Sequence, residues 1–266
     1  MLEVKDLFAG YNGVDVIRNI SFKVQRGESL CILGPNGSGK STLLKAIARI
    51  IDYRGIVTLK AGTGGALNGI DIMSFSRKEL AKKIALLGQT AQMFFPYTVY
   101  ETVSMGRYAY SRGFMKNLSA EDKTIIDNIL KQLDLWDIKE RMIDELSGGT
   151  LQRVFLAKTL AQTPDLILLD EPANHLDLKH QIEFLKFLKS WVSARSEAAE
   201  NNKILIGVFH DLNLARLFGD TAIVLDKGAI ATSGKIDEVL NSETLQAVYG
   251  IDVHGFMREA LRKWNS

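Results

Sequence analysis

The sequence predicts an α/β fold built on a parallel sheet, and three observations predict it. Apolar runs at residues 166–169, 204–208 and 222–225 alternate with helical patterns at 178–192, 211–218 and 235–248. This alternation is typical of a parallel sheet covered by helices. A glycine-rich segment near residue 40 joins an apolar strand to a helix, and residues 76–160 carry helical periodicity with few strand signals. We therefore expect one domain over residues 1–266, with a helical subdomain inserted at approximately 76–160.

The N-terminal region predicts strands first and then a helix. Residues 2–33 alternate polar and apolar positions between the turn signals Gly10, Asn12-Gly13 and Arg26-Gly27, which indicates several short strands ending in a buried one. Apolar residues from 43 to 51 recur at helical spacing. Residues 56–72 return to strand character, and the glycines within 62–65 predict an exposed hairpin loop.

Within the insert, helical periodicity covers residues 77–83, 99–108, 120–133 and 149–161. The polar residues 193–203 predict a loop between two elements of the core. The C-terminal helix is rich in Arg and Lys, and its simplest interpretation is a solvated surface helix.

The composition and net charge of the chain point to no particular partner. The chain has 46% hydrophobic and 24% charged residues and a formal charge of +2, without the basic excess of a nucleic-acid-binding protein. The single cysteine, Cys31, lies in an apolar run and is expected to be a small buried hydrophobe in a reducing compartment. No apolar run approaches the roughly 18 residues of a membrane span. We expect a chain that is neither secreted nor embedded, and that meets a membrane only through a partner.

A phosphate-binding loop is the strongest motif. It comprises Gly34, Pro35, Asn36, Gly37, Ser38, Gly39, Lys40, Ser41 and Thr42. Glycines let backbone N–H groups turn toward phosphate oxygens, and the following helix N-terminus favours negative charge. Lys40 can reach the β and γ phosphates, and the Ser41 hydroxyl can ligate Mg²⁺. A chance glycine-rich turn is the alternative, but both the pattern and its strand-to-helix context are matched.

Two acidic residues end the apolar strand at 166–169. Asp170 could complete the Mg²⁺ shell and Glu171 could polarise an attacking water. A solvated Asp-Glu turn is the simpler alternative for this pair alone, and the phosphate loop upstream disfavours it.

A third motif places Ser147, Gly148 and Gly149 directly before a helix. A serine and two glycines at a helix start can bind phosphate, although an ordinary helix cap uses the same residues.

Taken together, the phosphate loop, the Ser-Gly-Gly segment, the acidic strand and the later His210 resemble ATP-binding cassette (ABC) ATPases in order and spacing, over nearly the whole chain. The resemblance implies a P-loop NTPase core with an antiparallel β subdomain and an α-helical insert. It also implies a homodimer across two ATP sites, in which Ser147, Gly148 and Gly149 contact the γ-phosphate held by the opposite subunit. Asp177 would then help to couple the two sites. One departure is Thr150, where the family commonly has Gln or Glu.

Three further positions match the family. Tyr11 resembles the aromatic platform on which adenine stacks, although simple packing is an alternative. Gln89 resembles the glutamine that touches Mg²⁺ and reports the nucleotide state to a membrane partner. His210 resembles the histidine that contacts the γ-phosphate, whereas an isolated histidine is more often structural.

Finer features resemble the branch that imports iron-siderophore, haem and cobalamin. These are residues 96–108, the run 119–122 and the segment 210–215. The resemblance implies two polytopic permease subunits, an indirect periplasmic or extracellular substrate-binding protein, no nucleic acid, and a peripheral position on the cytoplasmic face of the cell membrane. It places the permease contact near Gln89 and residues 97–102. A soluble cassette in nucleic-acid or cofactor-assembly work is the alternative, and a non-hydrolysing regulatory cassette is a third.

Overall fold

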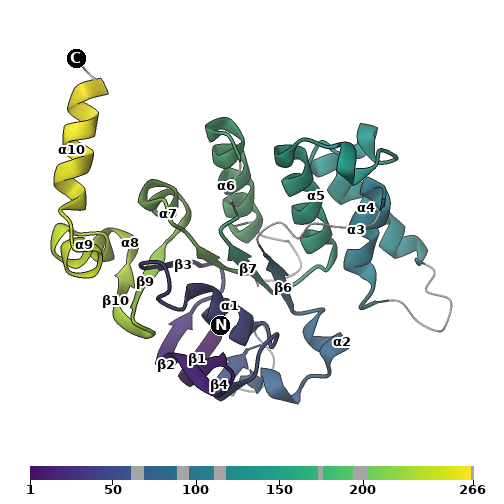
Figure 1. Cartoon of the computed structure of the whole chain (residues 1–266). Helices are drawn as coiled ribbons and strands as arrows, with labels where there is room; N and C mark the ends of the chain where they lie inside the picture. Colours follow the sequence, from purple (N-terminus) through teal and green to yellow (C-terminus); the bar gives the residue numbers. More distant parts are fainter. Residues whose placement is uncertain (61–68, 89–95, 111–117, 173–175, 194–202, 265–266) are drawn as a thin grey trace.

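A computed structural model describes residues 1–60, 69–88, 96–110, 118–172, 176–193 and 203–264 of the chain. Its strands form two sheets, one of four and one of six strands (Figure 1). The four-stranded sheet has the order β2-β1-β4-β5, and the six-stranded sheet has the order β10-β9-β3-β8-β7-β6. The predicted α/β class is therefore confirmed.

The four-stranded sheet is antiparallel and comes from the N-terminal region. Its strands are β1 (Leu2–Tyr11), β2 (Val14–Val24), β4 (Tyr53–Leu59) and β5 (Ile70–Asp71). Asn12 and Gly13 connect β1 to β2 with positive φ at both residues, 52° and 77°. A two-residue turn of this kind matches the twist of a hairpin, and an Asn-Gly pair adopts it readily.

The six-stranded sheet is parallel except for the strand that comes last in the sequence, which is antiparallel to its neighbour. Its members are β3 (Ser29–Leu33), β6 (Ile84–Leu87), β7 (Leu166–Asp170), β8 (Ile204–Val208), β9 (Thr221–Asp226) and β10 (Ala229–Lys235). Every residue of β3, β7 and β8 is buried. Central parallel strands are covered on both faces, which explains why these segments are continuously apolar instead of alternating.

Ten α-helices occur in the described part of the chain. They are α1 (Lys40–Ile47), α2 (Arg77–Leu80), α3 (Val99–Ser104), α4 (Ala120–Gln132), α5 (Gly148–Ala161), α6 (Leu178–Ser193), α7 (Leu212–Phe218), α8 (Ile236–Val239), α9 (Ser242–Tyr249) and α10 (Val253–Trp264). Short 3₁₀ turns are η1 (Ile72–Ser74), η2 (Met105–Arg107), η3 (Trp136–Ile138) and η4 (Ile143–Glu145). None of the described helices has the length and apolar character needed to cross a membrane.

Two hydrophobic clusters hold these layers together. One contains α1, the inner faces of β1, β2 and β4, and one face of the parallel strands. The other covers the opposite face of the parallel sheet with residues of helices α3 to α9. Cys31 is free and fully buried in the second cluster, as predicted. The parallel sheet is thus sandwiched, and Figure 1 shows α10 standing away from this body.

Three elements differ from the sequence prediction. Strand β6 lies inside the stretch expected to be helical and pairs in parallel with β7, because its four apolar residues are buried at the sheet edge. Strand β10 was not predicted; the turn at Lys227-Gly228, with φ of 45° and 83°, folds it back onto β9. The expected helix at 235–248 is two helices, because Asn241 caps the start of α9. The hairpin loop predicted at 62–65 and most of the loop predicted at 193–203 lie outside the described residues.

A buried ion pair joins η2 to α4 within the helical region, and the same arginine also bonds the end of α5. Arg107 Nε donates to Asp122 Oδ1 at 2.8 Å, and the two side chains are only 4% and 8% exposed. Arg107 Nη1 also donates to the carbonyl of Ala161 at 2.8 Å, and the guanidinium stacks on the ring of Tyr110. Burial alone would raise the pKa of Asp122, but hydrogen bonds from Arg107 and Ser119 hold it below its usual range. The carboxylate therefore stays charged, and this stabilising contribution is lost only as the pH falls through that lowered pKa.

Replacing this arginine is expected to destabilise the fold. Arg107→Met leaves the Asp122 carboxylate buried without its cation, so the free energy of unfolding should fall by about 3–5 kcal/mol. Denaturant unfolding monitored by circular dichroism measures the change. The matched control is Arg216→Met, which breaks the ion pair with Asp237 where both side chains are about two-thirds exposed and should change stability by less than about 1 kcal/mol. Equal losses in the two variants would contradict the structural role of Arg107.

Candidate functional site

The predicted phosphate loop lies between the end of β3 and the start of α1. Asn36 and Gly37 form its exposed turn, while Ser38, Gly39 and Lys40 are buried. The N–H groups of the first turn of α1 have no earlier helical turn to bond, so this end of the helix can bind an anion. Ser41 and the buried Thr42 lie in that first turn.

Two glycines of the loop are required by their surroundings. A Cβ on Gly34, whose φ is 138°, would lie 2.1 Å from the carbonyl oxygen of Leu225. A Cβ on Gly39, whose φ is 100°, would lie 2.5 Å from the side chain of Ile17 on β2. The loop is therefore pressed between β9 on one side and the antiparallel sheet on the other, and only glycine fits at both positions.

Lys40 and Ser38 have polar atoms inside the loop. Lys40 Nζ donates to the carbonyls of Gly34 and Pro35, each at 2.9 Å. Burial lowers the pKa of the Lys40 ammonium, and the nearby carboxylates of Glu171 and Asp170 oppose that shift. Ser38 is 3% exposed, and its hydroxyl oxygen is buried without a hydrogen-bond partner among the described residues. A buried polar atom of this kind calls for a partner, and a phosphate oxygen would be a suitable one.

The structure brings two predicted metal-binding side chains together. The Ser41 hydroxyl donates to Asp170 Oδ1 at 3.0 Å, although the two residues are far apart in sequence. Burial raises the pKa of the Asp170 carboxyl, the Ser41 hydrogen bond lowers it, and Glu171 raises it further. A hydroxyl and a carboxylate side by side are oxygen ligands of the kind that Mg²⁺ prefers, and a bound cation would favour the ionised carboxylate.

Glu171 and His210 also meet. His210 Nε2 lies 2.5 Å from Glu171 Oε1, with the carboxylate side chain 13% exposed and the imidazole 39% exposed. Glu171 has a φ of 52°, in the left-handed region that a residue with a Cβ adopts at some energetic expense. The strained turn follows the last residue of β7, and the hydrogen bond from Glu171 N–H to the carbonyl of Val208 ties it to β8.

The Ser-Gly-Gly segment lies at the start of α5. Ser147 is its N-cap, and Ser147 Oγ accepts from the N–H of Thr150 at 3.3 Å. The Thr150 hydroxyl lies 3.0 Å from the same oxygen, so the residue that departs from the family pattern contacts the serine directly. A Cβ on Gly149 would meet Leu176 and His180 at ordinary contact distances, which places the segment after Glu171 against this helix start. Ser147, Gly148 and Gly149 therefore lie together at the start of α5. None of the described hydrogen bonds joins them to the phosphate loop.

Asp177 precedes α6 and binds His180. Its two carboxylate oxygens contact the N–H and the Nδ1 of His180 at 2.9 and 2.8 Å. These hydrogen bonds lower the pKa of the Asp177 carboxyl. Asp177 is exposed, as expected for a residue proposed to act on another molecule.

Tyr11 is placed at the end of β1, opposite Val14 across the first hairpin, and is 44% exposed. The next residues of β2, Val16 and Ile17, pack against Gly39 of the phosphate loop. This arrangement puts the aromatic ring on the same strand pair that borders the loop. Gln89 lies outside the described residues, directly after the end of β6 and Gly88.

Sequence reasoning missed two residues that contact this site. Gln152 is buried in α5, and its Nε2 donates to the carbonyl of Pro172 at 2.8 Å, which joins the helix after Ser147 to the segment after Glu171. Tyr249, on α9, accepts a hydrogen bond from the N–H of Gly34 at 3.2 Å. Its position, 215 residues after the loop, gives no local signal. Gln152 follows the Ser-Gly-Gly segment closely and could have been singled out from that context.

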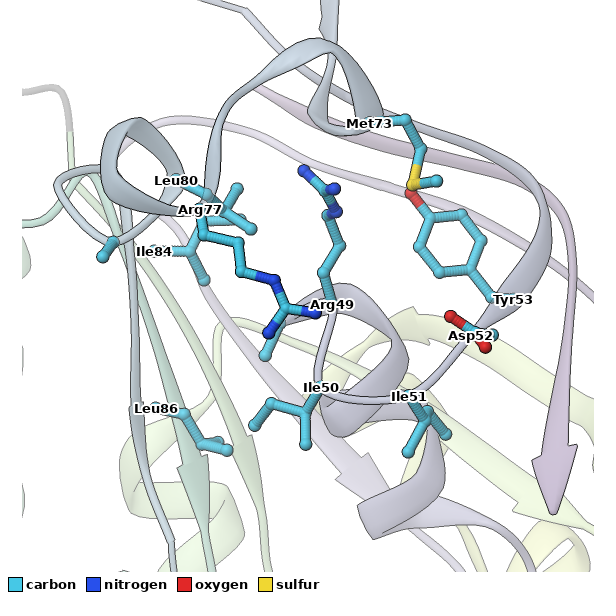
Figure 2. A pocket seen from close by; sticks show the side chains of 12 residues that line it. Arg49, Ile50, Ile51, Asp52, Tyr53, Met73, Arg77, Leu80, Ile84 and Leu86 are labelled. Atoms are coloured by element: carbon cyan, nitrogen blue, oxygen red, sulfur yellow. The ribbon is translucent and has the colours of Figure 1, made fainter.

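A surface groove of about 460 Å³ lies beside the strand that leads to Gln89. Figure 2 shows Ile84 and Leu86 of β6 on one side, Ile50 and Ile51 at the base, and Arg77 reaching over them. Across the groove stand Arg49, Tyr53 and Met73. The Arg49 guanidinium donates to the carbonyls of Ile72 and Phe75, each at 2.8 Å, and so fixes the wall that carries Met73. Ile50 and Met73 are more than half exposed, which leaves an apolar surface open to another molecule.

Comparisons with known proteins show which family the chain belongs to. The ABC transporter family model matches residues 17–174. The chain is 36% identical over 254 residues to the petrobactin import ATP-binding protein YclP of Bacillus subtilis, covering 95% of this chain and 94% of that protein. It is 34% identical over 261 residues to the hemin import ATP-binding protein HmuV of Rhodopseudomonas palustris, covering 95% and 88%.

Among solved structures, the dimeric structure of MJ0796, a bacterial ABC transporter cassette, superposes with a TM-score of 0.72 at 28% identity. The superposition covers 89% of this chain and 99% of that one. The family match and the two relatives together span the phosphate loop, the Ser-Gly-Gly segment and the acidic strand. The chain is therefore a member of the ABC transporter family and is an ATP-binding subunit that hydrolyses ATP for transport.

Proposed function

We propose that this chain powers an importer of metal chelates of the iron-siderophore, haem or cobalamin type. The observation that carries this proposal is the similarity, along almost the full length of both chains, to proteins named for petrobactin and hemin import. The contacts between Ser41 and Asp170 and between Glu171 and His210 also support an active motor over a regulatory cassette.

ATP would be held by the phosphate loop. The residues fit the group: in the described part of the chain the buried hydroxyl oxygen of Ser38 has no hydrogen-bond partner, Lys40 lies within the loop, and α1 begins at its end. Mg²⁺, when bound at Ser41, Asp170 and Gln89, would neutralise charge on the phosphates. Lys40 would exchange its bonds to two backbone carbonyls for bonds to phosphate oxygens, and Tyr11 would stack on the adenine.

Glu171 would accept the proton of the attacking water. Its side chain is held near His210 by a short contact and by a strained backbone turn, so its carboxylate has a fixed position. His210 would hold that carboxylate while two copies of the chain are apart. It would bind the γ-phosphate once the two copies have closed on the nucleotide. General bases within hydrogen-bond reach contribute about 10²- to 10⁴-fold to rates.

Two copies would face each other across two nucleotides. Ser147, Gly148, Gly149 and Asp177 make no contact with the phosphate loop among the described hydrogen bonds, and Ser147 and Asp177 are exposed. They are therefore available to a second copy, and MJ0796, at 28% identity, is a dimer. Within each copy, residues of about 76–160 would act as the helical subdomain of a single domain over residues 1–266.

The groove of Figure 2 would receive a loop of the permease. It carries exposed apolar side chains at Ile50 and Met73, and its wall contains β6, the strand that ends just before Gln89. A permease segment in this groove would lie beside the strand that precedes Gln89, the residue proposed to touch Mg²⁺. Two permease subunits, one per groove, would place the pair of cassettes at the cytoplasmic face of the membrane, with a substrate-binding protein acting on the far side.

Co-purification from membranes tests the proposal. Tagged Glu171→Gln chain, isolated from gently solubilised native membranes with Mg-ATP, should recover a polytopic protein in stoichiometric amount. Adding Ile50→Asp should lower that recovery about tenfold or more, because burying an unpaired carboxylate against an apolar partner is unfavourable.

The control for that substitution is Leu217→Asp, a similarly exposed apolar residue on α7 away from the groove, which should leave recovery unchanged. Recovery with only soluble or nucleic-acid-bound partners would favour the soluble cassette instead. Equal recovery with and without Ile50→Asp would remove the groove from the permease contact.

A further inference from the structure

Helix α9, the helix before the C-terminal α10, contacts the phosphate loop through the side chain of its last residue. Tyr249 Oη accepts from the N–H of Gly34 at 3.2 Å, at the point where β3 ends and the loop begins. Tyr249 is the last residue of α9, and its ring packs against the larger hydrophobic cluster next to Val248 and Val253. Leu245, one turn earlier, is 2% exposed and holds the helix against the same cluster.

The helix ends at Tyr249 for a local reason. Gly250 follows with a φ of 73° and donates its N–H to the carbonyl of Gln246 at 2.9 Å. This glycine stop fixes the last turn of α9, because glycine adopts the left-handed conformation without steric strain. The position of the Tyr249 hydroxyl is thus determined by a partly buried ring at the end of a terminated helix.

Gly34 is held through both of its backbone polar groups. Its N–H donates to Tyr249, and its carbonyl accepts from Lys40 Nζ at 2.9 Å. Gly34 has a φ of 138°, which glycine adopts without steric strain. Glycine can also leave this conformation easily for others. When a nucleotide draws the Lys40 ammonium toward its phosphates, the Tyr249 hydrogen bond remains as a tie on this residue.

We propose that Tyr249 is a positioning residue that keeps the phosphate loop in its nucleotide-binding conformation, so that helix α9 helps to set the affinity for ATP. A loop already ordered loses less conformational entropy when the ligand binds. Without the hydroxyl, Gly34 would sample other conformations. The affinity for ATP would then fall in proportion to the fraction of molecules whose phosphate loop is in the binding-competent conformation. This inference rests on ATP binding, and is independent of the cargo and of the permease.

The test is Tyr249→Phe in the full chain, which keeps the partly buried ring and removes only the hydroxyl. The Kd for ATP, measured by titration calorimetry with Mg²⁺ present, should rise about two- to tenfold, as expected for one neutral hydrogen bond. The KM for ATP should rise by the same factor, while kcat at saturating ATP stays within about twofold. Hydrogen exchange at the Gly34 amide of the nucleotide-free protein should accelerate by a similar factor.

Tyr110→Phe is the matched control, because the Tyr110 hydroxyl bonds the carbonyl of Gln162 at 2.9 Å in the helical region. It should leave the Kd for ATP and the Gly34 amide unchanged. A merely structural role for Tyr249 would lower the folded fraction, and hence kcat, without changing the Kd. Unchanged Kd and unchanged Gly34 exchange in Tyr249→Phe would overturn the proposal. Failure of the parent chain itself to bind ATP would instead overturn the nucleotide site.

Discussion

Glu171→Gln is expected to abolish steady-state ATP hydrolysis while leaving ATP bound. The amide keeps the size of the side chain and can still bond to His210, but it cannot take a proton from water. The rate should therefore fall by about 10²- to 10⁴-fold, the contribution typical of a general base. The phosphate loop, Ser41 and Asp170 are untouched, so nucleotide should remain and hold two copies together. Size-exclusion chromatography without and with Mg-ATP, beside a phosphate-release assay, measures both effects.

Another strand of the same sheet supplies the control. Asp226 ends β9 as Asp170 ends β7, and Asp226→Asn makes the same carboxylate-to-amide change without touching the described site. That variant should hydrolyse ATP at the parent rate and show no nucleotide-trapped dimer. If Glu171→Gln stays monomeric with Mg-ATP, or hydrolyses at the parent rate, Glu171 is not the water-polarising residue.

Much of this site could be predicted because its parts are local in sequence. The loop around Lys40 requires glycines at fixed offsets and a helix immediately after, and a phosphate cradle built from backbone N–H groups has no other way to form. The pair of acids after β7 could be predicted for a similar reason. A buried parallel strand appears in the sequence as a continuous apolar run. Polar residues directly after such a run therefore mark the carboxyl end of the strand, where the chain leaves the sheet.

What could not be predicted depends on pairing between distant segments. Strand β6 is four apolar residues next to a helical pattern, and only its pairing with β7 makes it a strand. The approach of His210 to Glu171 requires β7 and β8 to be neighbours in register, which the sequence does not state. Tyr249 is the clearest case, because a tyrosine in a surface helix acquires its role only when α9 packs beside the end of β3.

Ser147→Arg is expected to eliminate ATP hydrolysis while the isolated monomer binds nucleotide with nearly unchanged affinity. The serine caps α5, and its Oγ is engaged by the N–H and hydroxyl of Thr150, so its described contacts lie within its own turn. Its proposed phosphate ligand belongs to the opposite copy. An arginine there would lose the cap, at about 1 kcal/mol, and would place a bulky cation where a small hydroxyl must approach a phosphate. Hydrolysis and monomer Kd, measured on the same preparation, separate the two effects.

Ser76→Arg distinguishes a lost cap from a lost interface. Ser76 caps α2 in the same manner, with its Oγ accepting from the N–H of Glu79 at 3.2 Å, and both residues are exposed, so the substitution removes a cap and adds a charge without disturbing a buried ion pair. We expect this variant to lose comparable stability and to retain hydrolysis. If both variants lose hydrolysis in proportion to stability, the Ser147 effect is one of folding. If Ser147→Arg weakens ATP binding by the monomer, its ligand lies in the same chain, and the head-to-tail arrangement of two copies must be abandoned.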